Sequence, residues 1–239
     1  NSTTMSEKER VQTVLFLRHG VAKHNLVDPQ TGQTPNLHDP ALLDPPLVDR
    51  GKKQALEAGE RIRVWWKTTQ LGESIELVIA SPLTRCIQTA FLAFMPGHDY
   101  SNPDRPEPPI LCLEQVRESF GMHYPDQRLD KRVLQKHWPG IRFGDMTDSD
   151  ELWKEYSRET IDDVIARVNE FLQWLVQRQE ENIVVVSHGV WIECCFREYF
   201  PDVLSGGRRV YNCDCFAGQV VSSGGTFVRL QHIQNISQG

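Results

Sequence analysis

The side chains in this sequence that are best suited to chemistry belong to two arginines and two histidines: Arg18, His19, Arg85 and His188. Guanidinium groups bind the oxygens of a phosphoryl dianion through paired hydrogen bonds. A neutral imidazole can attack phosphorus and form a covalent phosphohistidine. If these four side chains meet in one crevice, the chemistry that they favour is transfer of a phosphoryl group. The residue types alone do not decide which histidine is the nucleophile.

Three short apolar segments precede these side chains and are expected to position them. Residues 14–17, 77–80 and 183–186 are rich in β-branched and aliphatic residues and are bounded by strand-breaking residues. This pattern is typical of buried strands. Ligands of an open α/β sheet bind outside the carboxyl ends of its strands. We therefore expect the ends of these three strands to form one anion-binding site.

Segments with helical periodicity alternate with the predicted strands. Helices are expected over residues 49–67, with Asp49 as N-cap, and over residues 82–94, with Ser81 as N-cap. A further helix is expected to start after Thr160, which with Asp163 resembles a capping box.

A last predicted helix covers residues 190–199, whereas residues 119–147 are predicted to be an irregular insertion with a short helix near residues 149–156 after it. Residues 219–231 show the turn chemistry of a hairpin. The alternation predicts an α/β fold: one domain over residues 1–239, built as a three-layer α/β/α sandwich with a mostly parallel central sheet. Its core is expected over about residues 13–198, with the hairpin at one edge of the sheet.

Composition narrows the expected partners and location. The formal net charge of the 239 residues is −6, so nucleic acid and anionic membrane surfaces are not expected partners. No apolar segment approaches the roughly 20 residues that span a bilayer. The first ten residues are polar, which predicts no signal peptide. The six cysteines are scattered, which predicts free thiols. Together these features predict a cytoplasmic location. No cofactor and no metal are expected, and the oligomeric state is not predicted.

Four segments together resemble the phosphoglycerate mutase-like histidine phosphatase superfamily, branch 1, over roughly residues 13–198. They are Arg18-His19-Gly20 with Asn25 downstream, residues 46–55 with Val48 in place of the usual Thr, residues 81–90, and Ser187-His188-Gly189. The resemblance implies that His19 is the nucleophile and that His188 is a second catalytic histidine that contacts the phosphoryl oxygens. It also implies that Arg18, Asn25 and Arg85 bind phosphate without a metal.

The proton donor to the leaving group is less sharply defined. The resemblance implies a carboxylic acid after the fourth strand, and Glu118 fits this place. Gly121 follows Glu118 one position sooner than in the mutases, so Glu114 remains a competing proton donor.

The surrounding residues resemble a eukaryotic, largely fungal and protist, group of small phosphatases in this superfamily. That group shows an Asp-x-Arg motif, here Asp126 and Arg128, usually with Cys where this chain has Pro125. His123 and Arg128 are predicted to bind the substrate's leaving group. His24, beside Asn25, is a further candidate for contact with the substrate.

The predicted function is hydrolysis of a soluble, small-molecule phosphomonoester through a covalent phosphohistidine. One alternative is a phosphotransferase of the phosphoglycerate mutase type, although residues 119–147 do not resemble the mutase insertion. Another is a catalytically weak binding module on the same fold. The long segment 27–47 is expected to be a lid or binding loop. The physiological substrate is not predicted.

Overall fold

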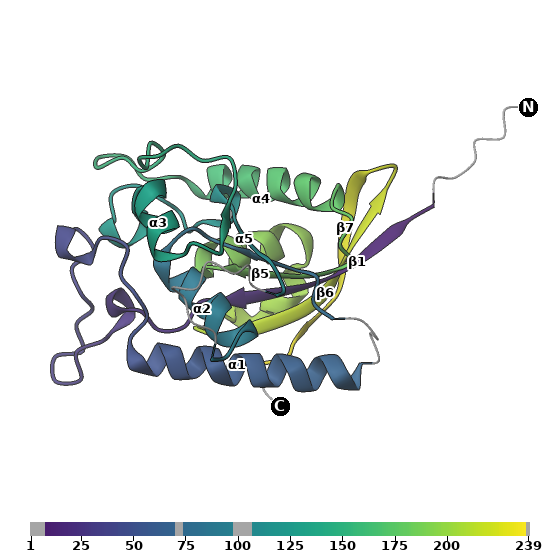
Figure 1. Cartoon of the computed structure of the whole chain (residues 1–239), viewed down its shortest axis with the longest axis horizontal. Coiled ribbons are helices and arrows are strands. Elements are labelled where there is room, and N and C mark those ends of the chain that lie inside the picture. Colours follow the sequence, from purple (N-terminus) through teal and green to yellow (C-terminus); the bar gives the residue numbers. More distant parts are fainter. Residues whose placement is uncertain (1–7, 70–73, 98–106, 238–239) are drawn as a thin grey trace, which may run out of the picture.

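A computed structural model describes residues 8–69, 74–97 and 107–237 of the chain (Figure 1). These residues form a seven-stranded sheet in the order β4-β3-β2-β5-β1-β6-β7. The strands are β1 (Arg10–Arg18), β2 (Leu77–Ala80), β3 (Ile110–Cys112), β4 (Arg142–Phe143), β5 (Asn182–Ser187), β6 (Cys215–Ser223) and β7 (Thr226–Asn235).

The central strands are parallel and end together. Arg18 of β1 pairs with Ser187 of β5, and Ala80 of β2 pairs with Val186. The three predicted strand ends therefore meet at one edge of the sheet, as expected. The hairpin of β6 and β7 is antiparallel and extends the sheet from β1, again as predicted, although both strands are longer than the sequence indicated.

Helices cover both faces of the sheet, which confirms the three-layer α/β/α sandwich. Alternate side chains of each central strand point to opposite faces. Leu15 and Leu17 pack in a core with α1 (Asp49–Thr68) and α2 (Thr84–Phe94), whereas Val14 and Phe16 pack with α4 (Ile161–Val176) and α5 (Gly189–Tyr199). Figure 1 shows α1 and α4 on opposite sides of the sheet.

The helix starts agree only in part with the prediction. Thr160 and Asp163 do form a capping box at α4, with the Thr160 hydroxyl accepting from the Asp163 amide at 3.2 Å. Asp49, predicted as the N-cap of α1, is instead its first helical residue and binds Lys52. The sequence could not exclude this position, because an acidic residue also suits the first turn of a helix.

Helix α2 starts at Thr84, two residues later than predicted, and Ser81 is not its N-cap. The amide and hydroxyl of Thr84 donate to the buried carboxyl of Asp44, at 2.8 and 2.7 Å. This distant residue satisfies the helix end and leaves the Ser81 hydroxyl for the site described below. Burial raises the pKa of Asp44 to about 6.

The insertion between β3 and α4 is more regular than predicted. It contains α3 (Lys131–His137), the short strand β4, and 3-10 turns η3 (Glu114–Val116) and η4 (Tyr124–Asp126). Helix α3 buries only Leu134, so no apolar stripe marks it in the sequence. The helix expected near residues 149–156 is absent there, where the chain forms bends, turns and an isolated bridge.

The predicted lid, residues 27–47, is anchored where it leaves and rejoins the fold. Ala22 and Leu47 form an antiparallel bridge, and the Leu47 amide donates to Gln88 of α2 at 2.7 Å. The segment includes η2 (Pro40–Leu42), and η1 (Lys23–Asn25) precedes it. None of the described helices is long and apolar enough to cross a membrane.

Candidate active site

The loop after β1 is held by very close backbone packing against α1. A Cβ atom on Gly51 would lie 2.0 Å from the Val21 carbonyl oxygen, and one on Gly20 would lie 2.4 Å from the Gly51 oxygen. The Gln54 side chain accepts a hydrogen bond from the Val21 amide at 3.0 Å. Gly51 and Gln54 thus have a structural role, because they fix the backbone that carries His19.

His19 is buried and presents one ring nitrogen to the neighbouring arginine. Its Nδ1 lies 2.7 Å from the Gly20 carbonyl oxygen, so Nδ1 carries the proton and donates. Its Nε2 lies 3.3 Å from the donating Nε of Arg85, so Nε2 carries a lone pair. Burial, with the positive charges of Arg85 and Arg18, lowers the pKa of His19 well below its ordinary value. The imidazole is therefore neutral, the form that a nucleophile requires.

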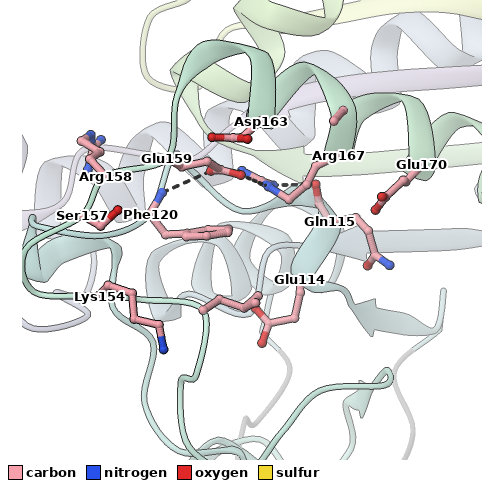
Figure 2. A pocket seen from close by; sticks show the side chains of 12 residues that line it. Glu114, Gln115, Phe120, Lys154, Ser157, Arg158, Glu159, Asp163, Arg167 and Glu170 are labelled. Carbon is pink, nitrogen blue, oxygen red and sulfur yellow. Dashed lines mark hydrogen bonds and ion pairs between the residues drawn. The ribbon is translucent and has the colours of Figure 1, made fainter.

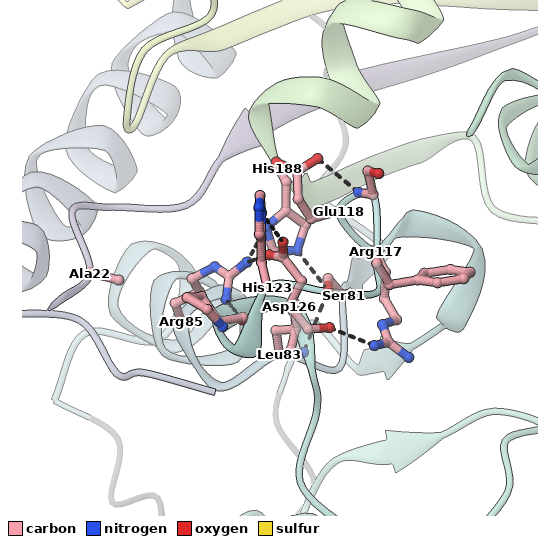
Figure 3. A network of polar contacts seen from close by, with 12 residues as sticks. Ala22, Ser81, Leu83, Arg85, Arg117, Glu118, His123, Asp126 and His188 are labelled. Carbon is pink, nitrogen blue, oxygen red and sulfur yellow. Dashed lines mark hydrogen bonds and ion pairs between the residues drawn. The ribbon is translucent and has the colours of Figure 1, made fainter. Parts of the chain in front are cut away.

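Arg85, in the first turn of α2, connects most of the site (Figure 3). Besides His19, its guanidinium donates to the Pro125 carbonyl oxygen at 2.5 Å and to Asp126 at 3.0 Å. It also donates to Nδ1 of His188 at 3.1 Å. A fully buried cation held in one plane by fixed partners is pre-organised to bind an anion.

Arg18 supplies the second positive charge at the end of β1. One terminal nitrogen donates to the Val210 carbonyl oxygen at 2.5 Å. Its Nε is buried and has no hydrogen-bond partner among the described residues. The guanidinium packs against Gly189, where a Cβ atom would lie 3.2 Å from the Arg18 Cζ. This contact gives a physical reason for glycine in Ser187-His188-Gly189.

His188 stands just before α5, and its ring centre lies 5.0 Å from that of His19. Because its Nδ1 accepts from Arg85, its Nε2 carries the proton and donates to the Ser81 hydroxyl at 2.8 Å. Burial and the charge of Arg85 lower the pKa of His188 well below its ordinary value. The two histidines therefore differ in the nitrogen that carries the proton, a difference that the sequence could not show.

His24 and Asn25 follow in the same loop, within η1. The His24 ring centre lies 5.9 Å from that of His19, and its Nδ1 is buried without a hydrogen-bond partner among the described residues. Burial and the two nearby arginines lower the pKa of His24 to about 2. The Asn25 side chain accepts from the Ala22 amide at 3.1 Å and so closes the loop.

Glu118 lies at the same edge of the sheet, after η3. Its carboxyl oxygens face the amides of Ser119, at 3.0 Å, and Val190, at 3.4 Å. Burial raises the pKa of Glu118, and the neighbouring charge of Asp126 raises it further, while Arg18 and Arg85 act in the opposite direction. The surroundings of Glu118 thus shift its equilibrium toward the protonated form, the form that a proton donor requires.

Glu114, the competing proton donor, is placed differently. Its two oxygens form ion pairs at 2.7 Å with the buried side chains of Arg117 and Arg128. Figure 2 shows Glu114 lining a separate cavity of about 550 Å³ beside Phe120 and α4. None of the predicted phosphate-binding residues lines this cavity.

The structure does not bring Arg128 to the predicted leaving-group pocket. Its side chain is fully buried, and its guanidinium donates to Glu114 and to carbonyl oxygens of residues 129 and 147–149. Arg128 thus holds the insertion together. His123 is partly exposed, with Nδ1 3.9 Å from Asp126 and its ring 5.2 Å from that of His38 in the lid segment.

Two contributors to the site had no clear signal in the sequence. The sequence predicts Ser81 as a helix cap, whereas in the structure its hydroxyl oxygen accepts from His188. Arg158, from the segment before α4, donates to Asp126 at 3.2 Å and to the Gly121 carbonyl oxygen at 2.9 Å. Only a three-dimensional arrangement brings residue 158 beside residue 126, since no spacing rule relates them.

Comparison with known proteins agrees with this geometry. The profile of the histidine phosphatase superfamily (branch 1) matches residues 14–231. The chain belongs to this superfamily. A phosphoglycerate mutase-like protein of Arabidopsis thaliana is 29% identical over a 240-residue alignment that covers 90% of this chain and 86% of the relative. Phosphoglycerate mutase-like protein 1 of the same plant is 32% identical over a 219-residue alignment that covers 81% of this chain and 75% of the relative.

A solved structure shows the same fold. It is that of a putative α-ribazole-5′-phosphate phosphatase of Escherichia coli, with a TM-score of 0.56 and 20% identity, covering 95% of this chain and 98% of that one. The superfamily places the chain in the histidine phosphatase class of enzymes, and its plant relatives are named as phosphoglycerate mutase-like.

Proposed function

We propose that this protein is a phosphatase that hydrolyses a small phosphomonoester through a covalent phosphohistidine on His19. The observation that carries the proposal is the neutral, buried His19, whose unprotonated Nε2 is aimed at the Arg85 guanidinium. A phosphoryl group that enters between them meets a nucleophile on one side and a fixed donor on the other.

The substrate phosphate is bound by the arginines and the second histidine. Arg85 and the unpartnered Nε of Arg18 donate to the phosphoryl oxygens, with His24 and His188 beside them. Two positive charges offset the two negative charges of the phosphomonoester, so the protein itself neutralises the group that is transferred. Because these charges are supplied by the protein, we propose that no metal ion takes part.

In the first step the His19 Nε2 attacks phosphorus, the Nε2–P bond forms and the ester P–O bond breaks. The leaving alkoxide takes the proton of the Glu118 carboxyl. In the second step a water molecule attacks the phosphohistidine, Glu118 takes up a proton from that water, and inorganic phosphate leaves with His19 restored. The nucleophile and the proton donor of the first step need the protonation states that burial favours, a neutral His19 and a protonated Glu118, and the first step leaves Glu118 ionised for its role as base in the second.

A phosphoglycerate mutase-type phosphotransferase is the second candidate, because the relatives reported above are named as mutase-like. Both candidates use phospho-His19 and differ in its fate. A phosphatase transfers the phosphoryl group to water, and a mutase returns it to a phosphoglycerate.

The test combines trapping with turnover. The purified protein is mixed with a ³²P-labelled phosphomonoester, quenched at high pH and examined for acid-labile label, beside His19→Ala and the control His137→Ala, which replaces an exposed histidine in the last turn of α3. We expect label and phosphate release in wild type and in His137→Ala, and neither in His19→Ala. Label that persists in His19→Ala would overturn the proposal. Exchange between 2- and 3-phosphoglycerate, primed by bisphosphoglycerate and faster than phosphate release, would favour the mutase.

The same assay, run over sugar phosphates, nucleotides, phosphotyrosine and inositol phosphates, would identify the substrate class. A protein that binds these compounds without turnover would be a binding module on this fold.

A further inference from the structure

Asp126 is a buried carboxylate that joins the phosphate-binding arginine to the insertion. One of its oxygens accepts from Arg85 at 3.0 Å and the other from Arg158 at 3.2 Å. Its side chain is 8% exposed. The preceding residue, Pro125, offers its carbonyl oxygen to a second nitrogen of Arg85. The η4 turn therefore holds two of the three guanidinium nitrogens and leaves Nε directed at His19.

A second contact makes this turn rigid. The Asp126 carbonyl oxygen accepts from Arg117 at 2.7 Å, and Arg117 is itself paired with the buried Asp150 at 2.7 Å. A carboxylate held at its backbone and at both oxygens can fix the plane of the guanidinium that it binds. The orientation of this plane matters because the Arg85 guanidinium donates hydrogen bonds only in its own plane, and the phosphoryl oxygens beside His19 must lie there to accept them.

Asp126 is also joined to the segment of Glu118, because its carbonyl oxygen accepts from the side chain of Arg117, the residue before Glu118, at 2.7 Å. Figure 3 shows Asp126 and Glu118 in the same polar network, where the negative charge of Asp126 raises the pKa of Glu118. The two acids have different surroundings. Asp126 is paired with two guanidinium groups, whereas Glu118 faces only two backbone amides at hydrogen-bond distance. When two carboxyl groups share a buried site, the proton goes to the one with fewer cationic partners.

We propose that Asp126 is a positioning residue with two effects: it holds Arg85 in plane beside His19, and its charge keeps Glu118 protonated for transfer to the leaving group. The inference rests on the proposed function, since it assigns a partner to each of two groups in that mechanism. The other charged or titratable groups around this pair include Arg18, Arg85, Arg117, His123, Arg158 and Arg167; the last donates to the Glu118 carbonyl oxygen at 3.3 Å and is paired with Glu159. The five arginines are cations, and Asp126 is the acid among these groups whose charge raises the pKa of Glu118.

The test separates the charge from the contact. Asp126→Asn keeps an oxygen for Arg85 and removes the charge, whereas Asp126→Ala removes both. Asp150→Asn is the matched control, because Asp150 is a buried carboxylate of the same insertion that pairs with Arg117 instead of Arg85. For each variant, kcat/KM is measured from pH 5 to pH 9 on 4-nitrophenyl phosphate and on an alkyl phosphate that wild type hydrolyses. The aryl leaving group departs without protonation, so the alkyl-to-aryl ratio reports the protonated fraction of Glu118.

In wild type this ratio falls as pH rises through the pKa of Glu118. In Asp126→Asn the fall should begin at lower pH, because the carboxylate that opposed ionisation of Glu118 is gone. Between the two midpoints the ratio in the variant should drop about tenfold per pH unit relative to wild type. Asp150→Asn should keep the wild-type midpoint. Asp126→Ala should in addition lose on the order of 10²-fold in kcat on the aryl phosphate, comparable to loss of a fixed transition-state donor.

An unchanged midpoint of the alkyl-to-aryl ratio in Asp126→Asn would refute the proposed effect of the charge on Glu118. A wild-type kcat in Asp126→Ala would refute the proposal that Asp126 positions Arg85. If Asp126→Ala does not fold, the midpoint of the alkyl-to-aryl ratio in Asp126→Asn still decides the charge effect, and Asp126→Ser replaces Ala for the contact. Wild-type turnover that does not require His19 would instead refute the proposed function, so the two failures are distinguishable.

Discussion

Replacement of Glu118 and Glu114 by glutamine should affect two different properties of the protein. Among the described residues Glu118 forms no ion pair, and its oxygens face backbone amides. Glutamine keeps an oxygen for these amides but cannot give up a proton to a leaving alkoxide. We therefore expect Glu118→Gln to lose about 10²–10⁴-fold in kcat on an alkyl phosphate. On 4-nitrophenyl phosphate the loss should be far smaller.

The stability of Glu118→Gln should show the opposite trend. A carboxyl whose pKa is raised on folding contributes stability at low pH, and this contribution disappears as pH rises through the pKa in the folded state. Above that pH the buried carboxylate costs free energy in wild type, and the amide does not. The free energy of unfolding of Glu118→Gln, measured in urea at pH 8, should equal or exceed that of wild type.

Glu114→Gln should instead destabilise the fold and leave catalysis nearly intact. Its carboxylate lies 2.7 Å from two arginines whose side chains are fully buried. Removing one partner of a buried ion pair costs about 3–5 kcal/mol, and the amide oxygen retained here lowers this to about 2–4 kcal/mol. That is a large part of a typical unfolding free energy of 5–15 kcal/mol, so the loss is readily measured.

The two variants are assayed side by side for urea unfolding and for kcat on both substrates. A selective loss of alkyl phosphate turnover in Glu114→Gln, with Glu118→Gln near wild type, would show that the proton donor is misassigned. Equal losses on both substrates in Glu118→Gln would show that its effect is structural.

Three further outcomes are expected from the same structure. Arg85→Lys should reduce kcat/KM by a factor equivalent to about 2–4 kcal/mol, because a lysine ammonium cannot replace a planar guanidinium that donates to four partners. Near-normal turnover would place Arg85 outside the phosphate site. Incubation with EDTA followed by gel filtration should leave kcat unchanged, since two guanidinium groups already offset the phosphoryl charge, whereas activity lost and then restored by Mg²⁺ would contradict this. Burial raises the pKa of Asp44 to about 6, so its protonated form stabilises the fold at low pH and this contribution is lost as pH rises through about 6. Wild type should therefore lose on the order of 2–3 kcal/mol of unfolding free energy between pH 4 and pH 7 relative to Asp44→Asn. Parallel stability curves for the two proteins would disprove this.

The parts of the fold that could be predicted are those in which local pattern and packing agree. Residues 14–17, 77–80 and 183–186 are apolar on both faces because helices cover both sides of the sheet, and such segments are short and easily recognised. The side chains that follow them meet because parallel strands end at one edge. Position after a strand was thus enough to group His19, Arg18, Arg85 and His188.

The parts that could not be predicted depend on partners far apart in the chain. Ser81 has the residue type of a helix cap, but the orphan amide of α2 is satisfied by Asp44. Arg128 carries a residue type suited to phosphate, but its donors are used by backbone carbonyls of the insertion. A sequence gives the donors and acceptors of each residue, and only the fold decides which of them are already used.

The bridge between Ala22 and Leu47 has a consequence for how new specificities could arise or be made. It closes the lid segment at its base, and Gln88 secures the same point from α2. The exposed residues 26–34 can therefore be lengthened, shortened or exchanged without pulling on the backbone that carries His19, and without removing His24, Asn25 or the Asp44 that caps α2. Doubling the length of such a closed loop costs only about 0.6 kcal/mol in closure entropy. A library of foreign loops can thus be inserted into this segment and screened for new substrates, while the catalytic residues keep their positions.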